Sequence, residues 1–239
     1  MAKNIIIAMW SGPRNLSTAL MRSFGNRQDV TNVLDEPFYG SYLLSTNKEH
    51  PMKDEVINSQ LTDINDVKNL CIKNNSGITY QKHMTHHILD KDFSWLDTLT
   101  NCFLIRNPEM VVKSFMKSWK DGDFEDIGFK QQHDIFNYVK NYLNEKPLII
   151  DASKLRSDPE RVLTKFCLLA DIEWDKDMLK WSPGIKDYDG IWASHWYPSV
   201  VNSTSFKPEE HRELILSDNE KRIVERAMPI YEDLYKYSI

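Results

Sequence analysis

The sequence predicts an α/β fold in which a parallel sheet is covered by helices on both faces. Short apolar or β-branched runs alternate with longer segments of helical periodicity along most of the chain. Strand and helix alternating in this way are typical of a parallel sheet, because neighbouring parallel strands need a crossover connection. The 239 residues contain no internal repeat, low-complexity tract or convincing linker, so we expect a single domain over residues 1–239.

The pattern opens with a buried strand at residues 5–9, where three isoleucines are followed by alanine and methionine. A helix is predicted at residues 17–25, which begins Ser-Thr-Ala-Leu-Met-Arg. The second strand is predicted at residues 30–34, and two segments of helical period follow at residues 53–60 and 64–73. These elements make the first strand–helix–strand unit of the sheet.

The middle of the chain supplies two further strands, at residues 77–81 and 102–105. The second of them is stopped by Asn-Pro, and proline is well suited to the first position of the helix predicted at residues 109–119. A longer amphipathic helix is predicted at residues 127–143.

The last part of the chain begins with a fifth strand at residues 148–150. Asp-Pro-Glu then opens a helix at residues 158–170, because aspartate caps and proline begins a helix. Residues 182–208 lack periodicity and are rich in Gly, Pro, Ser, Trp and Tyr, which for a loop of this length indicates a functional role. A closing helix is predicted at residues 217–237, perturbed at Pro229.

Composition limits the classes of function. Hydrophobic residues make up 41% and charged residues 27%, the balance of a globular protein. The formal net charge of −5 does not indicate binding to nucleic acid, so any site for an anion must be a local concentration of positive charge. No apolar run is long enough for a signal-peptide core or a membrane span, and we expect a cytoplasmic protein without a membrane partner. The three cysteines suit neither a disulfide framework nor a zinc site and are expected in the core.

The turn between the first strand and the first helix has the features of a phosphate-binding loop. Backbone N–H groups and the positive helix dipole meet there, and an arginine and two hydroxyls add further donors. A Walker A loop would end in Gly-Lys-Ser/Thr, which this turn lacks. An ordinary turn with a surface arginine and a serine cap stays equally open. The residues of the loop are Ser11, Gly12, Pro13, Arg14, Asn15, Leu16, Ser17 and Thr18.

A second candidate lies at the end of the fourth strand. Arg106 ends this strand and is followed by Asn-Pro, with Ser114 two turns into the next helix. Ligands of open α/β sheets bind beyond the carboxyl ends of the strands, which is where Arg106 is expected. A lone arginine at this position is structural about as often as functional.

The two motifs together resemble the sulfotransferase family. A Pro-Arg-x-x-Ser-Thr loop after the first strand and an Arg-Asn-Pro-x-x-x-x-x-Ser segment after the fourth are similar to its motifs, and residues 150–160 and 184–207 resemble its later segments. The resemblance implies an αβα sandwich of the P-loop type and the co-substrate 3′-phosphoadenosine 5′-phosphosulfate (PAPS). It implies that the first loop holds the 5′-phosphosulfate and that Arg106 and Ser114 hold the 3′-phosphate.

The chain departs from the family pattern at two places. Leu16 replaces a glycine that many members carry, and the last loop lacks the usual Arg-Lys-Gly, which leaves Lys186 as its counterpart.

Sulfuryl transfer requires a positive charge at the leaving phosphate, for which the resemblance implies Arg14, and a base that accepts the proton of the acceptor group. We favour Glu36, just after the second strand, because some relatives use a glutamate in this region. His83 is the alternative, since other relatives use a histidine after the third strand.

These patterns predict a sulfotransferase that acts on a hydroxyl or amine of a small-molecule acceptor. A nucleotide-dependent phosphotransferase is the first alternative, although the loop lacks its lysine and no strand offers a clear metal-binding aspartate. A nucleotide-binding module without catalysis is the second. No metal is expected, since the clustered His83, His86 and His87 have no carboxylate at ligand spacing. A homodimer stays open.

Overall fold

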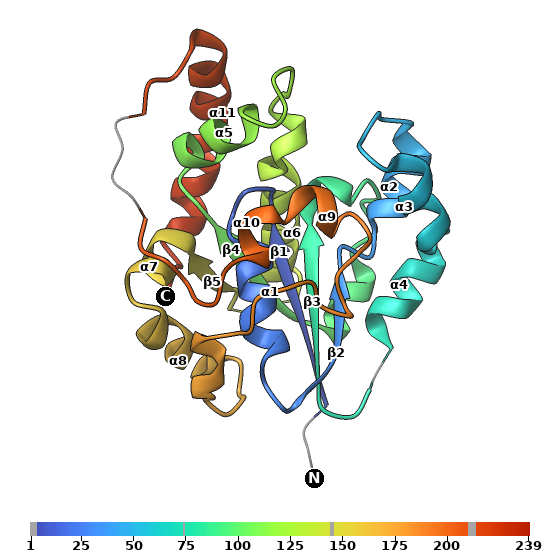
Figure 1. Ribbon diagram of the computed structural model, residues 1–239, viewed down its shortest axis with the longest axis vertical. Coiled ribbons are helices and arrows are strands. Elements are labelled where there is room, and N and C mark those ends of the chain that lie inside the picture. The colour runs from blue at the N-terminus through green and yellow to red at the C-terminus, as the bar shows by residue number, and fades with distance from the viewer. Residues whose placement is uncertain (1–3, 74, 144–145, 210–213) are drawn as a thin grey trace.

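Five parallel strands form one sheet in the order β2-β3-β1-β4-β5 (Figure 1). The structure is a computed structural model, and it describes residues 4–73, 75–143, 146–209 and 214–239. Each predicted strand is present, which confirms the α/β fold class. The strands are β1 (Ile5–Ser11), β2 (Val30–Asp35), β3 (Ile78–Met84), β4 (Thr100–Ile105) and β5 (Leu148–Asp151).

Helices cover both faces of this sheet, as the alternating pattern predicts. The longer helices are α1 (Ser17–Gly25), α2 (Tyr39–Thr46), α3 (Lys53–Ser59), α4 (Ile64–Ile72), α5 (Pro108–Met116), α6 (Phe129–Asn141), α8 (Pro159–Leu169) and α11 (Asp218–Tyr235). Short helices are α7 (Ala152–Ser157), α9 (Ala193–Trp196) and α10 (Pro198–Val201), with 3₁₀ turns η1 (Thr85–His87), η2 (Ser94–Thr98), η3 (Glu125–Ile127) and η4 (Lys176–Leu179).

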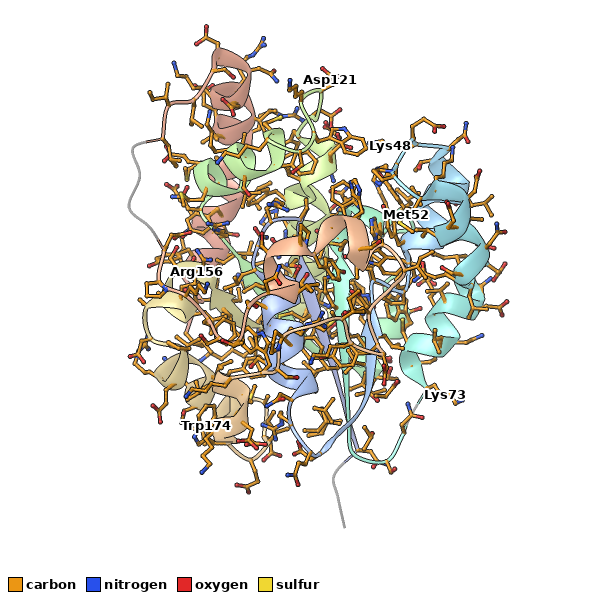
Figure 2. The ribbon with its side chains drawn as sticks, viewed as in Figure 1. Lys48, Met52, Lys73, Asp121, Arg156 and Trp174 are labelled. Atoms are coloured by element: carbon orange, nitrogen blue, oxygen red, sulfur yellow. The ribbon has the colours of Figure 1, made fainter. Side chains whose placement is uncertain are left out.

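The two faces of the central strand β1 enter different hydrophobic cores. Ile7 and Met9 pack with α1, α2 and α8, whereas Ala8 and Trp10 pack with α4, α6 and the end of α11. This follows from the two-residue period of a strand, and it produces the three layers seen in Figure 1. Figure 2 shows side chains filling the space between the sheet and the helices. The three cysteines are buried, as expected.

Helix α2 is the main element that the sequence pattern did not predict. Its sequence, Tyr-Gly-Ser-Tyr-Leu-Leu-Ser-Thr, contains residues of low helix propensity. Tyr39, Tyr42 and Leu43 are nevertheless buried in the core on the α1 side of the sheet. Tertiary burial therefore decides the conformation of this segment. The predicted helix at 127–143 begins later, at Phe129, because Gly128 before it has a φ of +71°.

Parallel strands bring all five carboxyl ends to one edge of the sheet, the upper edge in Figure 1. Gln132 on α6 donates to the backbone oxygens of Trp10 (2.9 Å) and Leu104 (3.0 Å), and so ties the ends of β1 and β4. Among the described residues, no helix is both long and apolar enough to cross a membrane. The carboxyl edge is where the candidate residues meet.

Candidate functional site

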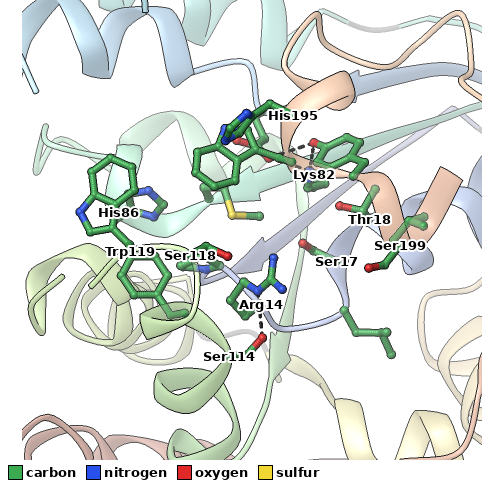
Figure 3. Close-up of a pocket in the computed structure, with 18 of the residues that line it drawn as sticks. Arg14, Ser17, Thr18, Lys82, His86, Ser114, Ser118, Trp119, His195 and Ser199 are labelled. Carbon is green, nitrogen blue, oxygen red and sulfur yellow. Dashed lines mark hydrogen bonds and ion pairs between the residues drawn. The ribbon is translucent and has the colours of Figure 1, made fainter. Parts of the chain in front are cut away.

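A cavity of about 550 Å³ opens at the carboxyl ends of β1, β3 and β4 (Figure 3). Its walls come from the first loop, the start of α1, helices α2 and α5, and residues 195–200 of the segment 182–208, which we call the lid loop. In Figure 3, Arg14 lies between the hydroxyls of Ser17 and Thr18 on one side and Trp119 with His86 on the other. The cavity thus has a hydroxyl-lined end and an aromatic end, with a cation between them.

The first loop has a tight path despite its few glycines. Arg14 and Leu16 have φ values of +62° and +74°, in the left-handed region that favours glycine. Leu16 therefore keeps the backbone conformation that a glycine would supply, while its side chain packs against the core. Gly12 is required for another reason, since a Cβ there would lie 2.3 Å from the Ile127 backbone oxygen. The loop thus combines two left-handed non-glycine residues with one glycine that steric contact requires.

The N-terminus of α1 opens into this cavity. Ser17, Thr18 and Ala19 line it, and the side chain of the N-cap residue, Leu16, makes no capping hydrogen bond. The first N–H groups of a helix have no partners within the helix, and the macrodipole makes this end positive. An uncapped helix end beside Arg14 is therefore a fitting site for an anionic group.

Two arginines meet beside the loop. The Nε atom of Arg14 donates to the Ser114 hydroxyl at 3.0 Å, and Nη1 of Arg106 donates to the backbone oxygen of Arg14 at 2.9 Å. Burial, and then the charge of Arg106, lower the pKa of Arg14 below its ordinary value. Among the described residues, no carboxylate pairs with Arg14 in this structure. An anion in the cavity would offset this unbalanced charge.

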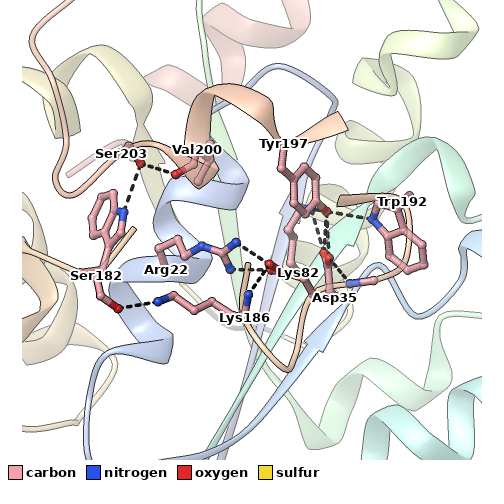
Figure 4. A network of polar contacts seen from close by, with 12 residues as sticks. Arg22, Asp35, Lys82, Ser182, Lys186, Trp192, Tyr197, Val200 and Ser203 are labelled. Atoms are coloured by element: carbon pink, nitrogen blue, oxygen red, sulfur yellow. Dashed lines mark hydrogen bonds and ion pairs between the residues drawn. The ribbon is translucent and has the colours of Figure 1, made fainter. Parts of the chain in front are cut away.

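A buried polar cluster lies on the opposite wall, at the ends of β2 and β3 (Figure 4). Asp35 and Lys82 are register partners, and Lys82 Nζ lies 2.8 Å from Asp35 Oδ1 and 2.6 Å from Glu36 Oε1. The Tyr197 hydroxyl contacts Lys82 and lies 2.9 Å from both Asp35 oxygens and 3.0 Å from Glu36 Oε1. Trp192 Nε1 donates to this hydroxyl at 2.9 Å. Lys82 is thus neither solvated nor free for a ligand.

Three members of this cluster line the cavity: Glu36, which is the predicted base, Lys82 and Tyr197. Burial raises the pKa of its carboxyl, although the neighbouring Lys82 opposes the shift. Among the described residues, Oε1 accepts the hydrogen bonds of the cluster and none ends on Oε2, which lies 4.0 Å from His87 Nδ1. Its φ of +48° is strained for a glutamate, and strain of this kind is found most often at functional sites.

His83, the alternative base, lies elsewhere. Its ring stacks on Trp10 with centroids 4.2 Å apart, and Nε2 lies 2.9 Å from Gln81 Oε1. It does not line the cavity, and burial lowers its pKa to about 3. The strand β3 continues to Met84, three residues beyond its predicted end. The alternation of side chains along the strand therefore directs His83 into the core that contains Trp10, on the face of the sheet away from the cavity. Other histidines do line the cavity: His86 and His87 on η1, together with His50 and His195.

The lid loop is held to the sheet by two buried anchors (Figure 4). Arg22 on α1 makes two bonds to Asp189, at 2.5 and 2.6 Å, and both side chains are almost fully buried. The N–H of Gly190 donates to Asp35 Oδ2 at 3.0 Å. Lys186, the predicted counterpart of the Arg-Lys-Gly segment, points instead to the Ser182 hydroxyl at 2.5 Å and does not line the cavity.

The structure brings most of the predicted residues to one cavity. Those that line it are Pro13, Arg14, Leu16, Ser17, Thr18, Glu36, Arg106 and Ser114. Those that do not are Ser11, Gly12, Asn15, His83 and Lys186, and the first three shape the loop from beneath.

Sequence reasoning missed several lining residues. They include Arg156, just after the fifth strand, and the aromatic end made by Tyr39, Tyr42, His50 and Trp119. A basic residue after a strand end was the available signal for Arg156, whereas nothing local marks the aromatic residues. Within the described ranges, no group of three or more His, Cys, Asp or Glu side chains could hold a metal ion.

Comparison with known proteins gives a consistent result. A family model described as "Sulfotransferase domain" matches residues 5–237. Two proteins of Arabidopsis thaliana, branched-chain-amino-acid aminotransferase-like proteins 1 and 2, are 34% and 32% identical to this chain over 237 and 232 residues. These matches cover 98% and 96% of this chain but 42% and 41% of the two relatives, so the chain spans less than half the length of the curated relatives it matches.

Solved structures match the fold. The sulfotransferase domain from the Synechococcus PCC 7002 olefin synthase aligns with a TM-score of 0.55 and 15% identity, covering 95% of both chains. The sulfotransferase domain from the curacin biosynthetic pathway aligns with a TM-score of 0.54 and 15% identity, covering 95% of this chain and 99% of the other. At this identity the likeness concerns the fold.

Proposed function

This chain belongs to the sulfotransferase domain family, and from that premise we propose that it transfers a sulfuryl group from PAPS to a hydroxyl or amine of a small molecule. The observation that carries the proposal is the composition of the cavity. A helix N-terminus and the guanidinium groups of Arg14 and Arg106 face a buried carboxylate, Glu36, across one space of about 550 Å³. Such a site suits an anionic donor beside an acceptor that must lose a proton.

The residues present fit the donor. The uncapped start of α1 suits the 5′-phosphosulfate, and Arg106 with Ser114 suits the 3′-phosphate that the family motif implies. The Nε atom of Arg106 is buried and has no hydrogen-bond partner among the described residues, so it is available to such a ligand. When bound, PAPS would supply the sulfuryl group and a stable phosphate leaving group.

Two residues would perform the chemistry. Glu36 would accept the proton of the acceptor group through Oε2, while that group forms a bond to sulfur and the bond from sulfur to the donor phosphate breaks. Arg14 would stabilise the negative charge that develops on the departing phosphate, since its charge is otherwise unbalanced in the cavity. Asp35, Lys82 and Tyr197 would keep the Glu36 carboxylate in place.

The aromatic end of the cavity is the proposed acceptor side. The rings of His50 and Trp119 lie 4.8 Å apart, and Tyr39 stacks on His87 at 4.6 Å. Burial lowers the pKa of His50 to about 4 and that of His86 to about 3, so these rings are neutral near pH 7. Neutral rings favour an acceptor with a flat or apolar body rather than a highly charged one.

The test begins with binding. Calorimetric titration in EDTA should show adenosine 3′,5′-bisphosphate binding at least about tenfold more tightly than AMP, because charge-assisted bonds to arginine are worth about 1.5–3 kcal/mol. Arg106→Ala should remove most of that difference. Equal affinities for the two nucleotides would remove the 3′-phosphate assignment, and tighter binding of ATP with magnesium would favour a phosphotransferase.

Transfer is tested separately. Sulfur-35 PAPS incubated with a panel of hydroxylated and amino compounds should label an acceptor, and the label should depend on Glu36. Tight binding of the bisphosphate without transfer to any acceptor, and without slow hydrolysis of PAPS, would indicate a nucleotide-binding module.

A further inference from the structure

A carboxylate of the chain itself lies against the arginines at the cavity edge. Glu209, directly after the lid loop, forms a short ion pair through Oε1 with Arg106 Nη2. The same oxygen lies 3.5 Å from Arg156 Nη1, and Oε2 accepts a hydrogen bond from the Ser153 hydroxyl at 2.8 Å. Three donors from the ends of two strands therefore converge on one side chain, since Arg106 follows β4 and the other two lie on α7 after β5.

Two of these three donors, Arg106 and Arg156, line the cavity, whereas Ser153 and Glu209 do not. Figure 2 shows Arg156 on α7, at the left of the view. Arg106 Nη1 also donates to the Arg14 backbone oxygen at 2.9 Å, so this guanidinium has a hydrogen-bond partner besides Glu209.

The charges at this site are not balanced by Glu209. The guanidinium groups of Arg14, Arg106 and Arg156 line one cavity, and Glu209 supplies one negative charge to the pair Arg106 and Arg156. A phosphate monoester carries about −1.5 to −2 charges at pH 7 and offers three acceptor oxygens in a tetrahedral arrangement. It would therefore neutralise this end of the cavity better than a planar carboxylate with one charge and two oxygens.

We propose that Arg156 and Ser153 complete, with Arg106, the site of the donor's 3′-phosphate, and that Glu209 occupies the phosphate position until the donor binds. This inference rests on the proposed function and adds to it a basis for selectivity. A nucleotide with a 3′-phosphate replaces Glu209 with a better anion, whereas one with a free 3′-hydroxyl leaves the carboxylate where it is. Nucleotides such as ATP and AMP are then disfavoured at this end of the cavity.

The central test measures binding to a Glu209→Gln variant by calorimetry, with the bisphosphate and AMP as probes. Glutamine keeps the shape of the side chain and removes the competing charge. If Glu209 occupies the site in about nine of ten molecules, the bisphosphate should bind about tenfold more tightly to the variant, while AMP affinity changes less than about twofold. Glu232→Gln, which removes an exposed carboxylate of α11 that does not line the cavity, is the matched control and should change neither affinity.

The other half of the proposal is tested with Arg156→Gln. It should weaken bisphosphate binding by about 10- to 100-fold, leave AMP affinity within about twofold, and reduce the gain from Glu209→Gln in the double variant. Melting temperatures measured alongside identify a variant that fails to fold, and Ser153→Ala then provides the milder change, with an expected loss of a few-fold.

The outcomes separate this inference from the proposed function. If the bisphosphate binds neither the wild-type protein nor Glu209→Gln, the donor assignment fails and this inference fails with it. If the wild-type protein binds it more tightly than AMP, but Glu209→Gln gains nothing or Arg156→Gln loses nothing, only the inference fails. In that case Glu209 is a structural partner of the arginines.

Discussion

Replacing Arg22 by methionine tests whether the buried pair with Asp189 holds the lid loop. Methionine keeps most of the volume but removes the charge and both hydrogen bonds, which measure 2.5 and 2.6 Å. Of its hydrogen bonds to the described residues, Asp189 would then keep the one from the backbone N–H of Lys186, at 2.8 Å, in a nearly solvent-free position. Loss of one partner of a buried ion pair typically costs about 3–5 kcal/mol.

This free-energy cost can be observed either as a lower melting temperature or as local opening of the lid loop. If the lid loop and the core unfold together, the melting temperature of Arg22→Met should fall by about 6–20 °C, since about 2–4 °C corresponds to 1 kcal/mol in a chain of this size. If the loop instead opens by itself, the melting temperature changes less and chymotrypsin should cut within residues 182–208 under native conditions. Either form should weaken donor binding, because residues 195–200 are part of the cavity wall.

The control is Arg161→Met, which breaks the exposed pair between Arg161 and Asp158 at 3.2 Å. Each of these two side chains is about half exposed, and pairs of this kind contribute about 0–1 kcal/mol. A double-mutant cycle of Arg22→Met with Asp189→Asn should give a coupling of about 2 kcal/mol or more. If Arg22→Met and Arg161→Met have the same melting temperature and the same resistance to chymotrypsin, the pair does not hold the loop.

Three further predictions follow from the site. Arg14→Ala should lower turnover more than it weakens binding of the bisphosphate, because the arginine acts on charge that develops during transfer; full turnover at saturating PAPS would limit Arg14 to ground-state binding. Glu36→Gln should lower turnover by about 10²–10⁴ with nucleotide affinity nearly intact, whereas His83→Asn should keep most of the turnover; the opposite result would select the histidine. Acid should destabilise the fold, because the folded-state pKa values of His83 and His86, about 3, lie below the ordinary 6.5 and the folded protein binds fewer protons. The stabilisation that these two neutral rings give the folded state is lost as the pH falls below 6.5. Each ring should lower the free energy of unfolding by about 2 kcal/mol between pH 7.5 and pH 5. Urea titrations at the two pH values measure this loss, and equal stabilities would contradict it.

The fold was predictable because its signals are local. Each strand contains apolar or β-branched residues, and helices such as α1 and α8 begin at the residues that their sequence signals indicate. Helix α2 was missed because its stability comes from burial of Tyr39 and Tyr42 rather than from propensity. The sequence pattern also did not predict where β3 ends. This strand runs to Met84, and its additional residues place Lys82 and His83 on opposite faces of the sheet.

The site was predictable only in part, because several of its contacts join distant segments. The loop and Arg106 carry recognisable motifs, and both line the cavity. The contact between Lys82 and Tyr197 joins positions 115 residues apart, and no sequence pattern around either residue predicts it. The same holds for Glu209, whose only significance is its place beside two arginines. The contacts of such residues can be recognised only in the folded structure.

The conformation of the first loop has a consequence for finding further chains of this kind. Phosphate loops are commonly searched for by the spacing of their glycines, since glycine adopts left-handed backbone angles without steric cost. In this chain Arg14 and Leu16, which are not glycines, adopt left-handed backbone angles in the first loop. Backbone dihedral angles compared position by position would detect such loops, and glycine-based patterns would pass them over.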